Sequence, residues 1–139
     1  MSGPRLHELF GELIHSYTRG QAIEDGVLID VSETARQAGF AWPVAMTAAA
    51  WEDCVAWTEE DSRRQIYQDE TGRLWDVVWM ASRAVKAAAR AGEQASLFQL
   101  FRVPRGGRGV RPRLATLKVM VGPGDGSEPV ITILLPHED

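Results

Sequence analysis

The chain has 139 residues, of which 45% are hydrophobic and 24% charged, and its formal net charge is −4. These fractions are those of an ordinary soluble globular protein, and the acidic balance argues against a dedicated nucleic-acid-binding domain, which is usually basic overall. Since Cys54 is the only cysteine and no apolar run approaches the roughly 18 residues that a membrane span requires, we expect one domain over residues 1–139 in a bacterial cytoplasm, with disorder only at its ends.

The first part of the chain is predicted to form two short helices and a strand. Apolar residues at helical spacing indicate an amphipathic helix within residues 6–14. A compact β-rich run over residues 26–31 indicates a short strand. Ser32 is a candidate N-cap for a helix that follows this strand, and Gly39 is a natural end for it.

Two further helices are predicted in the middle of the chain. Residues 44–57 carry apolar side chains at helical spacing, and either Pro43 or Thr47 is a suitable start for this helix. Thr58 then begins a capped turn or short helix. The clearest helical pattern is the apolar stripe of residues 74–91, which ends before a glycine.

After residue 93 the apolar period changes from helical to alternating. Three segments rich in β-branched and aromatic residues, 97–103, 113–121 and 129–135, are predicted as strands. Glycine- and proline-rich stretches join them, and the stretch over 122–129 is typical of a hairpin loop. Helices followed by strands predict an α+β two-layer domain with a C-terminal antiparallel meander. The meander has three strands, or four if the early strand joins it.

Charge is distributed unevenly along the chain. Residues 24–70 hold eleven acids against three arginines, a local balance of −8, whereas residues 102–118 hold six basic residues and no acid. Folding either brings the two segments together or leaves them to face different partners.

The acidic segment contains the residue types of a divalent-metal or acid–base site. Paired carboxylates bind divalent metals or transfer protons, but no histidine lies between residues 16 and 136. Helical spacing places Cys54 on a buried face without a base, so it is not a candidate nucleophile. We therefore expect no catalytic residue, no metal and no cofactor, and we interpret these acids as a solvated helix end. They are Glu52, Asp53, Glu59, Glu60 and Asp61.

The basic segment contains five arginines spaced by glycine over residues 102–113. Such a loop is suited to contact a nucleic-acid backbone, and the candidate contacts are Arg105, Arg108, Arg111 and Arg113. No aromatic side chain is interleaved with them to stack on bases. We therefore do not favour nucleic acid as the partner.

Tryptophans accompany the acidic segment and the helix that follows it. Trp75 and Trp79 are four residues apart and share a helical face beside the core stripe. Tryptophans so placed are first of all core residues, and second the residue type that dominates binding interfaces. The candidate binding residues are Trp57, Glu59, Glu60, Asp61, Arg63, Arg64, Asp69, Trp75 and Trp79.

From about residue 18 onward, the succession of segments resembles a family of small uncharacterised bacterial proteins. The segments that carry the likeness are "GVLIDVSETARQAGF", "WPVAMTAAAWEDCVAW", "YQDETGRLWDVVWMASRAV", "FQLFRVPR" and "LKVMVGPGDGSEPVITI". Members are often encoded on plasmids and integrative elements. The resemblance implies an accessory gene of a mobile element, such as a regulator, a defence protein or an anti-defence protein, and it assigns no catalytic residue.

Three functional hypotheses follow from these patterns. The first is a non-enzymatic protein-binding accessory factor, with an anti-defence role as one form, whose acidic and aromatic surface attracts a basic partner. The second is a small enzyme or binder that holds a nucleotide-like ligand through acids of residues 52–70 and an arginine. The third is a nucleic-acid binder that uses the arginine loop. We expect a protein partner and no membrane association.

Overall fold

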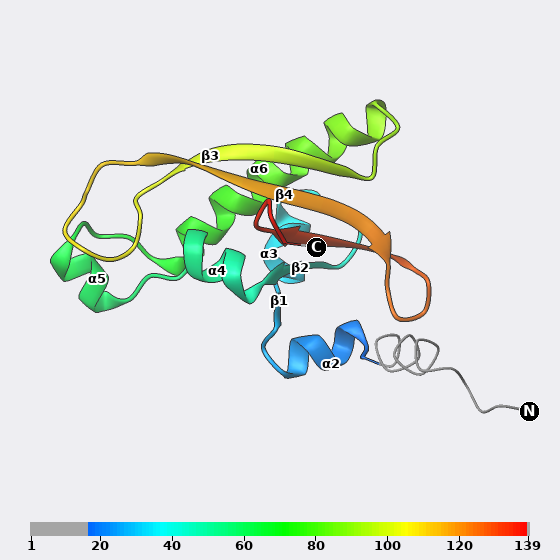
Figure 1. Cartoon of the computed structure of the whole chain (residues 1–139), viewed down its shortest axis with the longest axis horizontal. Coiled ribbons are helices and arrows are strands. Elements are labelled where there is room, and N and C mark those ends of the chain that lie inside the picture. The colour runs from blue at the N-terminus through cyan, green and yellow to red at the C-terminus, as the bar shows by residue number, and fades with distance from the viewer. Residues whose placement is uncertain (1–16, 139) are drawn as a thin grey trace, which may run out of the picture.

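A computed structural model describes residues 17–138 of the chain (Figure 1). The helix predicted within residues 6–14, and the disorder predicted at the start of the chain, lie outside these residues. The helices are α2 (Arg19–Glu24), α3 (Ser32–Gln37), α4 (Ala48–Cys54), α5 (Glu59–Arg64) and α6 (Glu70–Arg90). The strands are β1 (Leu28–Asp30), β2 (Val44–Thr47), β3 (Ala95–Arg102), β4 (Arg113–Pro123) and β5 (Pro129–Leu134).

The strands form one five-stranded mixed sheet in the order β1-β2-β5-β4-β3. The pairs β3–β4, β4–β5 and β1–β2 are antiparallel, and β2–β5 is parallel. The predicted α+β class and the meander of the last three strands are confirmed. The prediction of a purely antiparallel sheet of three or four strands is wrong. A fifth strand, β2, lies between β1 and β5 and pairs with β5 in parallel.

The strand β2 occupies the start of the segment predicted as a helix over residues 44–57. Val44, Ala45 and Met46 are all buried, and the backbone N–H of Ile131 donates to the carbonyl of Pro43 at 2.9 Å, extending the pairing with β5. The helix α4 begins only after Thr47, whose hydroxyl accepts from the N–H of Ala50. Tertiary pairing with β5 therefore overrides the local helical pattern at these residues.

The core lies between one face of the sheet and the helices α3, α4 and α6. Inward strand residues alternate with outward ones, and Val77, Val78 and Ala81 of α6 pack against them. The helix α6 is capped by Asp69, whose carboxylate accepts from the N–H of Gly72 at 2.7 Å. This helix lies along β3 (Figure 1), and side chains of both elements line one surface cavity.

The opposite face of the sheet is only partly covered. At the β2–β5 side, the guanidinium of Arg19 in α2 donates to the Thr132 hydroxyl at 2.8 Å, and Nζ of Lys118 donates to the carbonyl of Glu138 at 2.6 Å. At the β3–β4 side, no described segment covers the apolar side chains. They are Leu97, Phe101 and Leu114, with exposed fractions of 59%, 68% and 55%.

Candidate binding surface

The acidic and basic segments meet at α5. The side chain of Asp61 is buried and accepts hydrogen bonds from Arg64 Nη2 at 2.7 Å and Arg105 Nε at 2.8 Å. It also accepts from the backbone N–H and the hydroxyl of Thr58, completing a capping box. The N–H of Thr58, joined by the Arg105 guanidinium, holds the pKa of Asp61 at about 2 despite its burial. The Asp61 carboxylate therefore holds Arg105, and with it the loop over residues 102–113 (the arginine loop), to α5.

The backbone of the arginine loop is fastened to α5 by Gln65. The Gln65 amide donates to the carbonyls of Pro104 and Gly109 at 2.8 and 2.7 Å, and its oxygen accepts from the N–H of Gly106 at 3.0 Å. Arg64 Nε adds a bond to the carbonyl of Gly107 at 2.8 Å. Sequence reasoning missed Gln65, because a single polar residue after a short helix has no pattern that indicates this contact.

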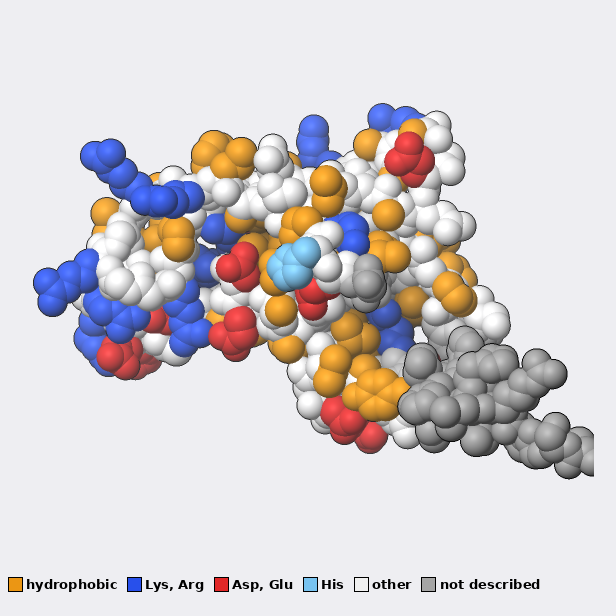
Figure 2. Space-filling model, in the orientation of Figure 1, with side chains coloured by type: hydrophobic (Ala, Val, Ile, Leu, Met, Phe, Trp, Pro, Cys, Tyr) orange, Lys and Arg blue, Asp and Glu red, His pale blue; other side chains and the backbone are white. Residues whose placement is uncertain are grey.

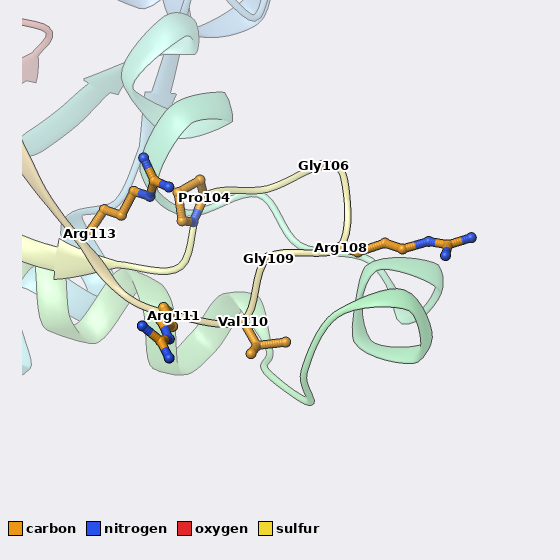
Figure 3. A pocket seen from close by; sticks show the side chains of 7 residues that line it. All are labelled: Pro104, Gly106, Arg108, Gly109, Val110, Arg111 and Arg113. Atoms are coloured by element: carbon orange, nitrogen blue, oxygen red, sulfur yellow. The ribbon is translucent and has the colours of Figure 1, made fainter.

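The four candidate nucleic-acid contacts have different environments. Arg105 pairs with Asp61 and with Glu52, the latter at 2.9 Å. Arg108, Arg111 and Arg113 are exposed, and no side-chain hydrogen bond from them appears within residues 17–138. They border a surface cavity of about 530 Å³. Figure 3 shows Arg108 directed away from the other two, so the three do not converge on one small anion.

Most of the other candidate acids have arginine or backbone partners close by. Glu59 and Glu60 face Arg63 and Arg64 one turn later in α5, at 4.0 and 3.6 Å. Figure 2 accordingly shows basic and acidic side chains together at the end of the molecule formed by α5 and the arginine loop. The surface is therefore less acidic than the local sequence balance suggests. Among the described residues, no three histidines, cysteines or acids are grouped to hold a metal.

The tryptophans divide into structural and exposed ones. Trp57 is buried, its indole N–H donates to Ser62 Oγ at 3.0 Å, and the Arg73 guanidinium lies 4.7 Å above its ring. Trp75 and Trp79 on α6 are 36% and 44% exposed and stack on each other with ring centroids 5.9 Å apart. We call these two residues the tryptophan pair. A partner can reach the tryptophan pair, but it cannot reach Trp57 or the buried Asp61.

Two buried arginines connect the helices to the end of β3. Arg102 donates to the carbonyls of Cys54 and Arg73 at 3.0 and 3.1 Å and pairs with Asp76 at 2.7 Å. Arg73 Nε donates to the carbonyl of Val55 at 3.0 Å. Burial, and then the neighbouring Arg102, lower the pKa of Arg73 to about 10. Sequence reasoning missed both, although Arg102 continues the inward alternation of β3.

The thiol of Cys54 is fully buried, and burial followed by the charge of Asp53 raises its pKa to about 12. Because the thiolate is the reactive form, we expect native protein at pH 8 to react negligibly with a thiol-specific disulfide reagent. The same reagent should titrate one thiol per chain after unfolding in guanidinium chloride. Rapid modification of the native protein would contradict the inert role of Cys54.

The fold is thus a mixed five-stranded sheet with α3, α4 and α6 on one face, and the candidate site is an open surface beside α6 and β3. The chain belongs to a family of unknown function, DUF6573, whose profile matches residues 8–139. No curated protein and no solved structure matches the chain. Within residues 17–138, no helix is both long and apolar enough to cross a membrane.

Proposed function

We propose that this protein is a non-enzymatic protein-binding module and that it contacts its partner through the tryptophan pair. The observation that carries the proposal is that Trp75 and Trp79 stack on each other at the surface, each more than a third exposed, and are not part of the core. Large aromatic rings left in water lose the stabilisation that burial provides, and tryptophan is the residue type most enriched at binding hot spots. Leu97 of β3, which is 59% exposed, borders the same surface cavity as Trp79.

The proposed setting is the bacterial cytoplasm, where the protein acts as an accessory factor of a mobile element, with an anti-defence role as one form. The resemblance to plasmid- and element-encoded proteins supports this setting. Glu59, Glu60, Arg63 and Arg64 supply a polar margin at α5, whereas Asp69 serves as the cap of α6. The nucleotide-ligand and nucleic-acid alternatives rank lower because Arg105 already pairs with carboxylates of its own chain.

Replacement of both members of the tryptophan pair by alanine is expected to abolish partner binding. Truncating a hot-spot tryptophan costs about 2 kcal/mol, or roughly 30-fold in affinity. We would compare wild type and the double variant in affinity capture from a bacterial lysate, followed by mass spectrometry. Trp42→Ala is the matched control, because Trp42 is equally exposed but lies outside α6.

The expected result is a stoichiometric protein partner that wild type and the Trp42→Ala variant retain and the double variant loses. Circular dichroism should show the same fold for all three proteins. A partner that the double variant retains in full would refute the assignment of the tryptophan pair. A copurifying nucleotide without a protein would favour the small-ligand alternative.

A further inference from the structure

The strand β3 is the edge of the sheet, and its outward backbone groups can be assigned from the register. The carbonyl of Gln94 accepts from the N–H of Val121 at 2.8 Å, and Gln94 is in register with Val121 one position before Ala95 and Met120. Bonded and non-bonded pairs alternate along an antiparallel ladder. Even-numbered residues of β3 therefore bond to β4, and odd-numbered ones direct their N–H and C=O groups away from the sheet.

The side-chain contacts of β3 agree with this assignment. The carbonyl of Leu97 accepts from the Ser96 hydroxyl at 3.1 Å, and that of Phe101 accepts from Arg102 Nε at 2.9 Å. The N–H groups of Leu97, Gln99 and Phe101 donate to no other element of the described chain. Three outward donors along an eight-residue strand leave an edge that a further strand can pair with.

A groove of about 620 Å³ runs between this edge and α6. Exposed side chains of α6 that recur at helical spacing line it, namely Trp79, Arg83, Lys86 and Arg90, and Leu97 lines it from the strand. The lining contains three basic side chains and no acidic one. All three basic side chains are exposed.

We propose that β3 accepts an acidic extended segment of a protein partner as a sixth strand of the sheet. Backbone groups of the segment would pair with the outward N–H groups of β3. Side chains on one face of the segment would be Asp or Glu and would reach Arg83, Lys86 and Arg90. Alternate side chains would be apolar and would lie beside Leu97 and Phe101 on the uncovered face. This inference rests on the proposed protein-binding function, since Trp79 belongs to both surfaces.

Two other occupants fit the same edge less well. A second copy of this chain would bring its own Arg83, Lys86 and Arg90 to the interface, and β3 contains no acid to pair with them. A nucleic acid would satisfy the charges of α6 but would leave the backbone N–H groups of β3 without a matching ladder of acceptors. An acidic strand pairs both with the basic side chains of α6 and with the outward backbone N–H groups of β3.

The test uses the full chain and a synthetic probe, acetyl-Glu-Val-Glu-Val-Glu-Val-Glu-amide, with a peptide in which Lys replaces Glu as its counterpart. We expect the acidic probe to change the tryptophan fluorescence of the protein, to which Trp79 contributes, and to slow amide hydrogen exchange at Leu97, Gln99 and Phe101. The Lys peptide should do neither. Exchange of amides at the β1 edge should not change with either peptide.

Two kinds of variant separate the charge and backbone contributions. The triple variant Arg83→Glu, Lys86→Glu, Arg90→Glu should bind the acidic probe at least about tenfold more weakly. Its control is Arg36→Glu, Arg108→Glu, Arg111→Glu, which changes the net charge equally at exposed residues outside the groove lining and should leave binding unchanged. Gln99→Pro removes one outward N–H and leaves every bond to β4 in place, so it should weaken binding. Gln99→Thr keeps this N–H and should not weaken binding.

Each other outcome overturns the proposal. Strand addition would be excluded if the charge-reversed triple variant and its control bound the acidic probe equally. It would also be excluded if the probe did not slow hydrogen exchange at the odd-numbered amides of β3. A dimeric mass by light scattering that Gln99→Pro converts to a monomer would assign the edge to a second copy. If the protein binds an oligonucleotide, and the triple variant loses this binding but Gln99→Pro keeps it, the groove beside β3 would be assigned to nucleic acid. If the captured partner is lost with the tryptophan pair but retained by Gln99→Pro, the proposed function stands and strand addition fails.

Discussion

Replacement of Arg102 by methionine is expected to lower the free energy of unfolding by about 3 kcal/mol. The guanidinium is buried and donates to the carbonyls of Cys54, Arg73 and Phe101. Cys54 is the last residue of α4, so Arg102 satisfies a carbonyl at a helix end that otherwise has no intrahelical donor. Methionine fills a similar volume but leaves the buried carbonyl of Cys54 without this donor, whereas the carbonyl of Arg73 keeps its donor within α6.

The measurement is urea denaturation followed by circular dichroism, with the slope compared between proteins. Asp76→Asn is the control, because it removes the ionic partner of Arg102 but keeps all its bonds to carbonyls. The Asp76 side chain is 58% exposed, so this change should cost less than about 1 kcal/mol. If both variants lose the same stability, the ion pair matters more than the carbonyl bonds, and the role assigned to Arg102 is wrong.

The second half of the fold could be predicted from local patterns because each element there satisfies a single periodicity. The helix predicted over residues 74–91 is α6, and the strands predicted at 97–103, 113–121 and 129–135 are β3, β4 and β5 within two residues at each end. These strands are consecutive neighbours, so short-range turn signals suffice to predict their order. The prediction succeeds here because the apolar period, the turn residues and the pairing of consecutive strands all indicate the same structure.

The strand β2 could not be predicted in the same way. Its apolar residues 44–46 precede the alanine-rich helix α4 without a glycine or proline between them, so the pattern reads as one helix. Only residues 131–133 of β5, far along the chain, give these residues a parallel partner. A short buried apolar run is ambiguous between helix and strand until its partner is known.

The candidate site was predictable in part. Helical spacing places Trp75 and Trp79 on one face beside the core stripe, and the structure stacks them there in solvent. Whether a given tryptophan is buried depends on long-range packing, which the local sequence around Trp57 does not contain. The basic side chains of α6 had no evident role in the sequence, because the groove that they line exists only when β3 lies beside the helix.

The contact between the acidic and basic segments was one of two outcomes that the charge map left open. The Thr58–Asp61 spacing is a local capping signal, but the Arg105–Asp61 contact joins residues 44 positions apart. Asp61 thus has two roles: it caps α5, and it holds the arginine loop to that helix. The charges of the two segments partly neutralise each other within the protein.

Replacement of Asp61 by asparagine is expected to lower the midpoint of thermal unfolding by roughly 5 to 10 °C at neutral pH. Asparagine has the same shape and an oxygen that accepts from Thr58, but it removes the buried charge that Arg64 and Arg105 share. These arginines then keep only the exposed carboxylates of Glu60 and Glu52. The arginine loop should then be held less tightly, although Gln65 still binds its backbone, and limited trypsin digestion should cleave after Arg105 or Arg108 faster than in wild type. Glu59→Gln, which changes an exposed acid in the same helix, should alter neither measurement.

The pH dependence distinguishes a charged Asp61 from one that acts only as a hydrogen-bond acceptor. Its pKa is depressed from an ordinary 3.8 to about 2, so its stabilising charge is fully present above the ordinary value and is lost as the pH falls through about 2. Wild type should therefore lose its advantage over Asp61→Asn progressively between about pH 4 and pH 2. A stability difference that stays constant over this range would show that the carboxylate charge does not hold the arginine loop to α5.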